Sequence, residues 1–211
     1  MTYGGRVRTS PIRPVVLRDG FEIDDPLSVV LDFLEAYRLD LGDASGSTSF
    51  GEPDVRLANR DGARISAAEM AAIVERRSAI QGALRKIDAD ATLMGPANAV
   101  PWLPLEQLFD AFAGIRGVGF SKMTKALHRK RPALIPILDS VVQTYLEDDR
   151  DARAPFKERA LGLVRGYKRD LDRNRTAVRA IRQELIERGY GLTEVRILDL
   201  LIWSVRAAGP T

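Results

Sequence analysis

Apolar residues recur every three or four positions along most of this chain, which places them on one face of an α-helix. No alternating pattern of apolar and polar residues competes over any length, so the sequence predicts an all-α fold. The expected helices follow Asp24-Asp25-Pro26, Ser66 and a glycine-rich hairpin at 114–119, and others cover about 105–112, 140–147, 155–171, 175–188 and 193–207.

Two of these helices begin with capping residues. Asp24 and Asp25 precede Pro26, and proline suits the first turn of a helix because its φ is already helical. Ser66 and Glu69 match a capping box, in which each side chain accepts a hydrogen bond from the backbone N–H of the other.

Two segments lack helical periodicity. Residues 1–24 are rich in Gly, Pro and Arg, and we interpret them as an N-terminal arm or irregular strand. Residues 40–64 carry Gly, Ser, Asp and Asn, which predicts a long loop with room for a short strand. Loops of this length are often functional or mobile.

Composition limits the chemistry of the chain. With 211 residues and 45% hydrophobic composition, it can bury a substantial core, as one domain or as two closely packed lobes. A membrane-spanning helix needs about 18 consecutive apolar residues, and no stretch of the sequence approaches that. The N-terminus also lacks the apolar core of a secretory signal, so we expect a soluble cytoplasmic protein. The chain has no cysteine and a single histidine, His128, so we expect no metal site.

Positive charge is concentrated in one segment, although the formal net charge is only +3. No acid lies between Ala111 and Leu138, while six cations do: Arg116, Lys122, Lys125, Arg129, Lys130 and Arg131. Such a segment is typical of a surface that binds a polyanion. The alternative is a solvated helix face.

The glycines of the hairpin indicate what kind of polyanion. Gly117 and Gly119 permit a tight turn with positive φ and leave the first amides of the next helix pointing outward. Phosphate oxygens can accept from such amides, and lysine or arginine adds charge without reading sequence. The residues predicted to bind DNA phosphate are Gly117, Val118, Gly119, Ser121, Lys122, Lys125 and Arg129. In the alternative interpretation, the glycines only end one helix and begin another.

The string IRGVGFSK followed by IPILDSVV resembles the helix-hairpin-helix DNA glycosylases. That superfamily has a hairpin of the form L-P-G-V-G and, after one helix, a catalytic aspartate in a segment like P-I-L-D-x-x-V. Bifunctional members place a Schiff-base lysine two residues after the second hairpin glycine and eighteen before the aspartate. Here those positions are Ser121 and Asp139, and a serine there resembles the adenine-glycosylase branch, which hydrolyses the glycosidic bond without a lysine nucleophile.

The resemblance implies a two-lobed helical domain over residues 25–211, with the helix-hairpin-helix at about 105–130. It implies monofunctional excision of a modified or mispaired base from double-stranded DNA, with Asp139 as the catalytic carboxylate. A monovalent cation at the hairpin is the one ligand it suggests, since an iron–sulfur cluster needs cysteine. Arg116 departs from the hairpin proline of the family, and Lys122-Met123 from its usual Thr-Ala.

Other interpretations stay open. Asp139 also suits the N-cap of the next helix. Trp102 stacks on a base or packs in the core, Glu106 and Asp110 donate protons or lie on a helix surface, and Arg196 and Asp199 pair with each other. A non-catalytic helix-hairpin-helix module and a helical interaction protein are the competing functions. The segment ALHRKRPALIPILDSVV, with RILDLLIW, is also similar to a family of uncharacterised bacterial proteins.

Overall fold

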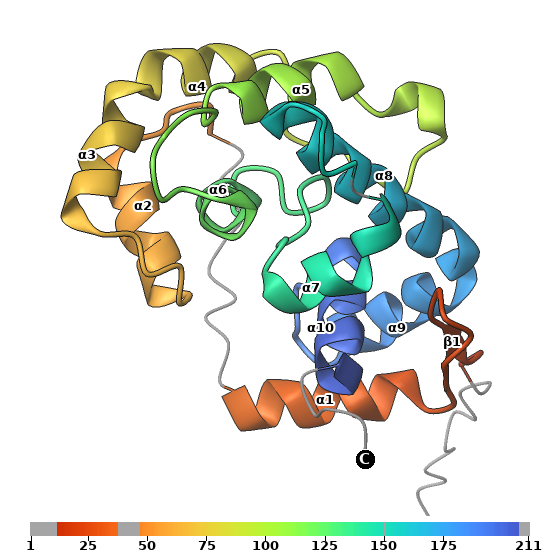
Figure 1. The fold of residues 1–211 in the computed structure, drawn as a ribbon. Helices are drawn as coiled ribbons and strands as arrows, with labels where there is room; N and C mark the ends of the chain where they lie inside the picture. The colour runs from red at the N-terminus through yellow and green to blue at the C-terminus, as the bar shows by residue number, and fades with distance from the viewer. Residues whose placement is uncertain (1–11, 38–46, 150, 207–211) are drawn as a thin grey trace, which may run out of the picture.

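The computed structural model describes residues 12–37, 47–149 and 151–206, and helices dominate it (Figure 1). The all-α class is therefore confirmed, and the only sheet among the described residues is a short antiparallel hairpin, β1 (Val15–Val16) with β2 (Glu22–Ile23). The helices are α1 (Pro26–Tyr37), α2 (Glu52–Arg60), α3 (Ala67–Glu75), α4 (Arg77–Leu84), α5 (Trp102–Asp110), α6 (Phe120–His128), α7 (Ser140–Tyr145), α8 (Phe156–Arg173), α9 (Arg175–Glu187) and α10 (Glu194–Arg206), with 3-10 turns η1 (Ala97–Ala99) and η2 (Glu147–Asp149).

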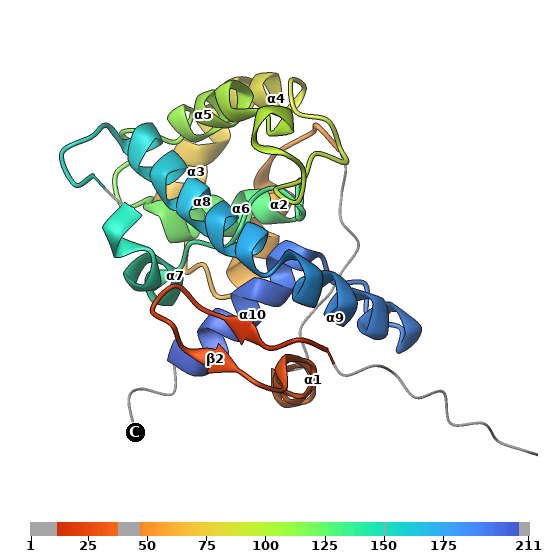
Figure 2. The same cartoon turned by 90° about the vertical axis from the view of Figure 1, so that its right-hand side faces the viewer.

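The helices lie in two groups. In Figure 1, α2 to α6 form the upper group, while α1, α7, α9 and α10 form the lower one. Helix α10 packs against α1, α7 and α9, so elements from both ends of the chain share the lower group. Helix α8 packs against α5 above and α9 below, and Figure 2 shows it crossing between the groups. The segment 129–139 leaves α6 in the upper group and enters α7 in the lower one.

Helix α2 corrects the predicted loop over 40–64. Residues 38–46 lie outside the described part of the chain, but residues 52–60 are helical rather than looped. The Gly51 N–H donates to Asp54 Oδ2 at 2.9 Å, which caps the start of the helix, and Val55 and Ala58 are buried. Only two buried apolar residues mark this helix, too few to give a periodic signal.

Of the two interpretations of the N-terminal segment, arm or irregular strand, the structure has strands within residues 12–24, while residues 1–11 lie outside the described part. Val15 and Leu17 are fully buried, and the Asn174 side chain at the end of α8 bonds both backbone groups of Val16, at 2.8 and 2.9 Å. The turn between the two strands reaches the end of α10, where Asp19 pairs with Arg206. Buried residues alternate over too short a stretch for the sequence to separate an arm from a strand.

Two glycines on one side of α8, Gly162 and Gly166, allow η2 to lie close to the helix. A Cβ on Gly162 would lie 2.5 Å from the backbone oxygen of Asp149, and one on Gly166 would collide with the Asp149 carboxylate. The absence of side chains at these two positions therefore sets how closely η2 approaches α8.

Replacing Gly162 by alanine should destabilise the protein, because the added methyl group must push η2 away. We expect the free energy of unfolding to fall by roughly 1–3 kcal/mol in urea titrations. The matched control is Gly82→Ala on α4, where the nearest atom to the new Cβ is 3.8 Å away. That change should stabilise by about 0.5–1 kcal/mol through helix propensity. Equal stabilisation by both substitutions would contradict the close contact of η2.

Candidate functional site

The hairpin before α6 has one glycine in the left-handed region and one in extended backbone. Gly117 has φ +81°, as predicted, but Gly119 has φ −93° and ψ −172°, so the prediction of positive φ was wrong there. Gly119 is extended because it is the N-cap residue of α6. No side chain caps this end of the helix, and nothing lies within 4 Å of the position of a Cβ on Gly119. Among the described residues, no side chain therefore occupies the position beside Gly119 or caps the first amides of α6.

The other side of the hairpin is covered by a carboxylate. Both oxygens of Glu69 lie 2.7 Å from Lys122 Nζ, and one accepts the Ser66 N–H at 2.8 Å. The bond from Lys122, followed by that from Ser66, lowers the pKa of Glu69 below its ordinary value. A Cβ on Gly117 would collide with this carboxylate. The predicted capping box is confirmed, and its glutamate also bonds the hairpin helix.

The next two cations of α6 hold the end of α2. Lys125 Nζ donates to the carbonyl oxygens of Asp61 and Gly62 at 3.1 and 3.3 Å, and Arg129 Nε lies 3.3 Å from the Asp61 carboxylate. Burial lowers the pKa of Lys125, although Asp139 and Asp61 oppose that shift. These side chains were expected to share an exposed face, and they lie against α2 instead.

Two further cations of the segment are buried. Lys130 Nζ lies 2.5 Å from the Asp54 carboxylate, and Arg131 donates to the carbonyl oxygens of Leu84 and Ile87 at 3.0 and 2.7 Å. Of the six cations, only Arg116 falls in the exposed class. The acids that the segment lacks are supplied by residues 54, 61 and 69. We call the contacts of Lys122, Lys125, Arg129 and Lys130 with these residues the α6 strip.

Residues 135–139, which we call the 135–139 segment, are bonded by side chains from α6, α7 and α10, and Gln143 of α7 donates to the Leu138 oxygen at 2.8 Å. From α6, His128 Nδ1 donates to the Ile135 oxygen at 2.6 Å, and Thr124 Oγ1 accepts the Leu138 N–H at 3.0 Å. From α10, Asp199 Oδ2 accepts the Ile137 N–H at 3.3 Å. Ser121 lies one turn before Thr124 and Lys125 on α6, the helix whose Thr124 and His128 bond this segment.

Asp139 follows this segment and caps α7. Its Oδ1 accepts the Val142 N–H at 3.0 Å, which confirms the predicted N-cap. Among the described residues, no hydrogen bond to its other oxygen is found. Burial lowers the pKa of Lys125 and raises that of Asp199; the charge of Asp139 opposes the first shift and adds to the second, so the three groups interact electrostatically.

Asp199 is the site residue that sequence reasoning missed. It was expected only to pair with Arg196, and that pair is present at 3.7 Å. The side chain is also buried, at 3% exposure, and its Oδ1 accepts no hydrogen bond from the described residues. Burial raises its pKa to about 7, against the opposing effect of Arg196. An acid inside the apolar run RILDLLIW was the available signal.

The other residues considered from sequence have structural partners. The Trp102 indole N–H donates to Ala97 O at 2.9 Å, and the Arg165 guanidinium covers its ring at 5.3 Å, as expected for a packed residue. Lys157 Nζ lies 3.1 Å from Glu106 and 4.0 Å from Asp110, on the surface. None of these side chains is free to act at Asp139.

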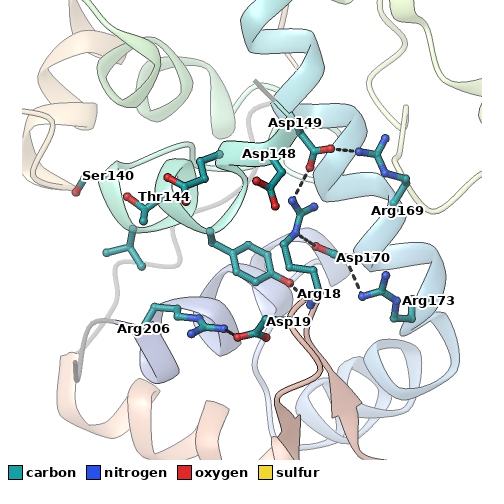
Figure 3. A pocket seen from close by; sticks show the side chains of 13 residues that line it. Arg18, Asp19, Ser140, Thr144, Asp148, Asp149, Arg169, Asp170, Arg173 and Arg206 are labelled. Carbon is teal, nitrogen blue, oxygen red and sulfur yellow. Dashed lines mark hydrogen bonds and ion pairs between the residues drawn. The ribbon is translucent and has the colours of Figure 1, made fainter. Parts of the chain in front are cut away.

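A cavity of about 700 Å³ opens beside α7 (Figure 3). Ser140 and Thr144 line it with hydroxyl groups, while Arg18 and Arg206 lie over the Tyr145 ring at 5.0 and 5.9 Å. Its arginines pair with its acids, as Arg18 does with Asp149 at 2.6 Å and with Asp170 at 3.2 Å. Asp139 is not among the lining residues, although Ser140 follows it directly.

Residues 12–37, 47–149 and 151–206 contain no cluster of three or more potential metal-ligating side chains. Nor is any helix there both long and apolar enough to traverse a membrane.

Comparison with protein-family models matches residues 62–206, more than half of the chain, to "Family of unknown function (DUF6308)". The matched residues include the hairpin, α6, Asp139 and Asp199. No curated protein and no solved structure matches the chain.

Replacing Gly117 by alanine should cost more stability than replacing Gly114. Both residues have positive φ, which alone costs alanine roughly 1 kcal/mol. Nothing lies within 4 Å of a Cβ on Gly114, whereas the Glu69 carboxylate blocks one on Gly117. We therefore expect Gly117→Ala to lose more free energy of unfolding in urea titrations than Gly114→Ala. Adding Glu69→Ala to the Gly117→Ala chain should reduce the loss caused by the glycine substitution to the Gly114→Ala value. Equal losses for the two single variants would show that Glu69 does not cover the hairpin.

Acid should destabilise the protein partly through His128. Burial, followed by the charge of Arg196, lowers the pKa of His128 from 6.5 to about 4. Because the unfolded chain takes up this proton at a higher pH, stability is lost as the pH falls from 6.5 toward 4, by about 3 kcal/mol. His128→Asn keeps a donor for Ile135 O but does not titrate. The free energy of unfolding of the wild type, minus that of the variant, should decrease as the pH is lowered over this range. A difference that does not change with pH would contradict a buried neutral imidazole.

Proposed function

Since this chain belongs to the family of unknown function DUF6308, we propose from its own structure that it is a helix-hairpin-helix DNA glycosylase. In this proposal it binds double-stranded DNA and hydrolyses the N-glycosidic bond of a modified or mispaired base. It is monofunctional, with Asp139 as the essential carboxylate and no lyase step.

The observation that carries the proposal is the contact between the hairpin helix and the residue before Asp139. The Leu138 N–H donates to Thr124 Oγ1 at 3.0 Å, and Thr124 is fully buried. The hairpin helix and the aspartate are thus coupled through a bond that is shielded from water. A DNA strand whose phosphate binds the hairpin would be held at a fixed distance from Asp139, and base excision requires such positioning.

DNA contact is supported by the open end of α6. Its first amides lack a cap, Gly119 faces open space, and Arg116 is exposed nearby. A phosphate would approach from the side of Gly119 and Ser121, because Glu69 covers the side of Gly117. Lys122, Lys125 and Arg129 then add positive potential rather than direct contacts, since their charged groups bond residues of this chain.

The reaction needs one carboxylate near the sugar. As the bond between C1′ and the base breaks, the base leaves with the electron pair and positive charge develops on the deoxyribose. Asp139 would stabilise that charge or orient the water that adds at C1′, and the base would take up a proton. The target base must first leave the helical stack.

The amines near Asp139 support hydrolysis over lyase chemistry. Ser121 stands where a Schiff-base lysine would, and a hydroxyl group cannot form that adduct. Lys122 Nζ is bonded to Glu69, and Lys125 Nζ to two backbone carbonyls. Neither amine is free to attack C1′.

A non-catalytic DNA-binding module is the second candidate. It is favoured by the absence of Asp139 from the lining of the cavity beside α7 and by the use of its Oδ1 as a cap. In that case the hairpin and α6 bind DNA, and Asp139 serves α7 alone.

Excision assays on Asp139→Asn separate the two candidates. Duplexes carrying uracil, alkylated bases, hypoxanthine or oxidised guanine are incubated with the protein, and abasic sites are then cleaved with alkali. We expect the single-turnover rate on the preferred lesion to fall at least about 100-fold in Asp139→Asn. Stability should be nearly unchanged, because asparagine caps helices about as well as aspartate.

The matched control is Asp25→Asn, which makes the same change at the exposed N-cap of α1, where Asp25 Oδ1 accepts the Ser28 N–H at 3.1 Å. It should excise at the wild-type rate. Undiminished excision by Asp139→Asn would refute the mechanism, and binding without excision across all lesions would favour the module.

A further inference from the structure

Four buried or half-buried side chains bond the backbone just before Asp139. His128 and Thr124 approach the 135–139 segment from α6, Gln143 approaches it from α7 and donates to the Leu138 oxygen at 2.8 Å, and Asp199 approaches it from α10. Asp199 is the only one of the four that carries a carboxylate, and its partner Ile137 lies two positions before Asp139. The position of Asp139 between the two helix groups therefore depends partly on a charge buried in α10.

Burying an ionisable carboxylate to accept a single N–H group carries a large desolvation cost. Asparagine could accept the same bond without burying an ionisable group, and Asp199 leaves its Oδ1 without a hydrogen bond among the described residues. Arg196 is 3.7 Å from Oδ2, too far for a short, well-formed ion pair. Such a group is found where its charge has a use, because packing alone would favour a neutral residue.

We propose that Asp199 is the positioning residue for Asp139: it fixes the 135–139 segment through the Ile137 N–H and couples its own ionisation to the Asp139 carboxylate. This inference rests on the proposed function. Asp199 is too buried to touch DNA, so it acts only through Asp139. When Asp199 is protonated, Asp139 is the single negative charge at the head of α7; when it ionises, the two carboxylates repel each other.

The charged and titratable groups around Asp199 come from four elements. Arg196 lies on its own helix, Tyr167 of α8 lies nearby and donates its hydroxyl to the Val195 oxygen at 2.5 Å, and the charge of Asp139 acts on it from the head of α7. His128 on α6 senses the same Arg196 and stays neutral. Asp139 raises the pKa of Asp199 while Arg196 and Tyr167 lower it, so removal of the Asp139 charge has a defined direction.

The test combines unfolding and excision over pH 5 to 9, roughly two units on either side of the expected midpoint. Urea unfolding compares wild type with Asp199→Asn, each with and without Asp139→Asn. Between pH 3.8 and about 7, Asp199 holds a proton in the folded state but not in the unfolded state. The free energy of unfolding of the wild type relative to Asp199→Asn should therefore fall as the pH rises and level off near pH 7, the midpoint of the Asp199 titration. With Asp139→Asn present in both proteins, the midpoint should move to lower pH. Asp25→Asn, the control, should leave it in place.

Single-turnover excision on the preferred lesion is the second arm. Asp199→Asn keeps an acceptor for Ile137 but carries no charge, so it should resemble protonated Asp199 below pH 7, slow excision by roughly 10- to 100-fold above it, and remove the inflection near pH 7. A residue with a purely structural role would be rescued by asparagine. A wild-type rate and pH profile in this variant would overturn the proposal.

The two arms fail in different ways. A midpoint that Asp139→Asn does not move would show that the carboxylates are not coupled, and the proposal would fall even if excision is seen. Absence of excision by the wild type on every lesion would end the catalytic role of Asp199 together with the proposed function, whereas the midpoint shift would still show whether the two charges sense each other.

Discussion

The α6 strip is the interaction on which the upper helix group depends. Helix α6 and the residues that directly follow it carry no acid, and their cations bond the carboxylates and carbonyl groups of residues 54, 61, 62 and 69. Several of these contacts are partly or fully buried, where a charge without a partner would be costly. The strip therefore fixes α2 and the start of α3 against α6, and it decides which parts of α6 remain open to another molecule.

The same strip limits how the hairpin can be used. Glu69 occupies the space beside Gly117 that an external anion would need, so the open approach is restricted to Gly119 and the uncapped amides of α6. On the inner side of α6, Thr124 and His128 grip the 135–139 segment. Helix α6 thus has an uncapped N-terminus at Gly119, and its Thr124 and His128 side chains bond the segment that leads to Asp139. The proposed base excision uses both sides of this helix at once.

The sequence predicted the helices with strong periodicity, the capping box at Ser66 and the cap at Asp139. It failed at α2, because a short helix with two buried residues looks like a loop. That failure explains the larger one: the acids at 54 and 61 were assigned to a loop, so the cations of α6 seemed to lack partners. Asp199 was missed for a related reason, since an acid three residues from an arginine resembles a surface pair. Pairings between distant segments are not encoded in local periodicity.

The most direct measurement is amide NMR of the protein titrated with a short DNA duplex at low salt. If the open end of α6 binds phosphate beside Asp139, the largest shifts will fall on the amides of Gly119, Phe120 and Ser121, with a second set at Ser140 and Val141. Raising the salt concentration will reverse them, because phosphate contacts release counterions. Shifts confined to other surfaces, or none at low salt, would contradict the assignment of this hairpin as a DNA-binding site.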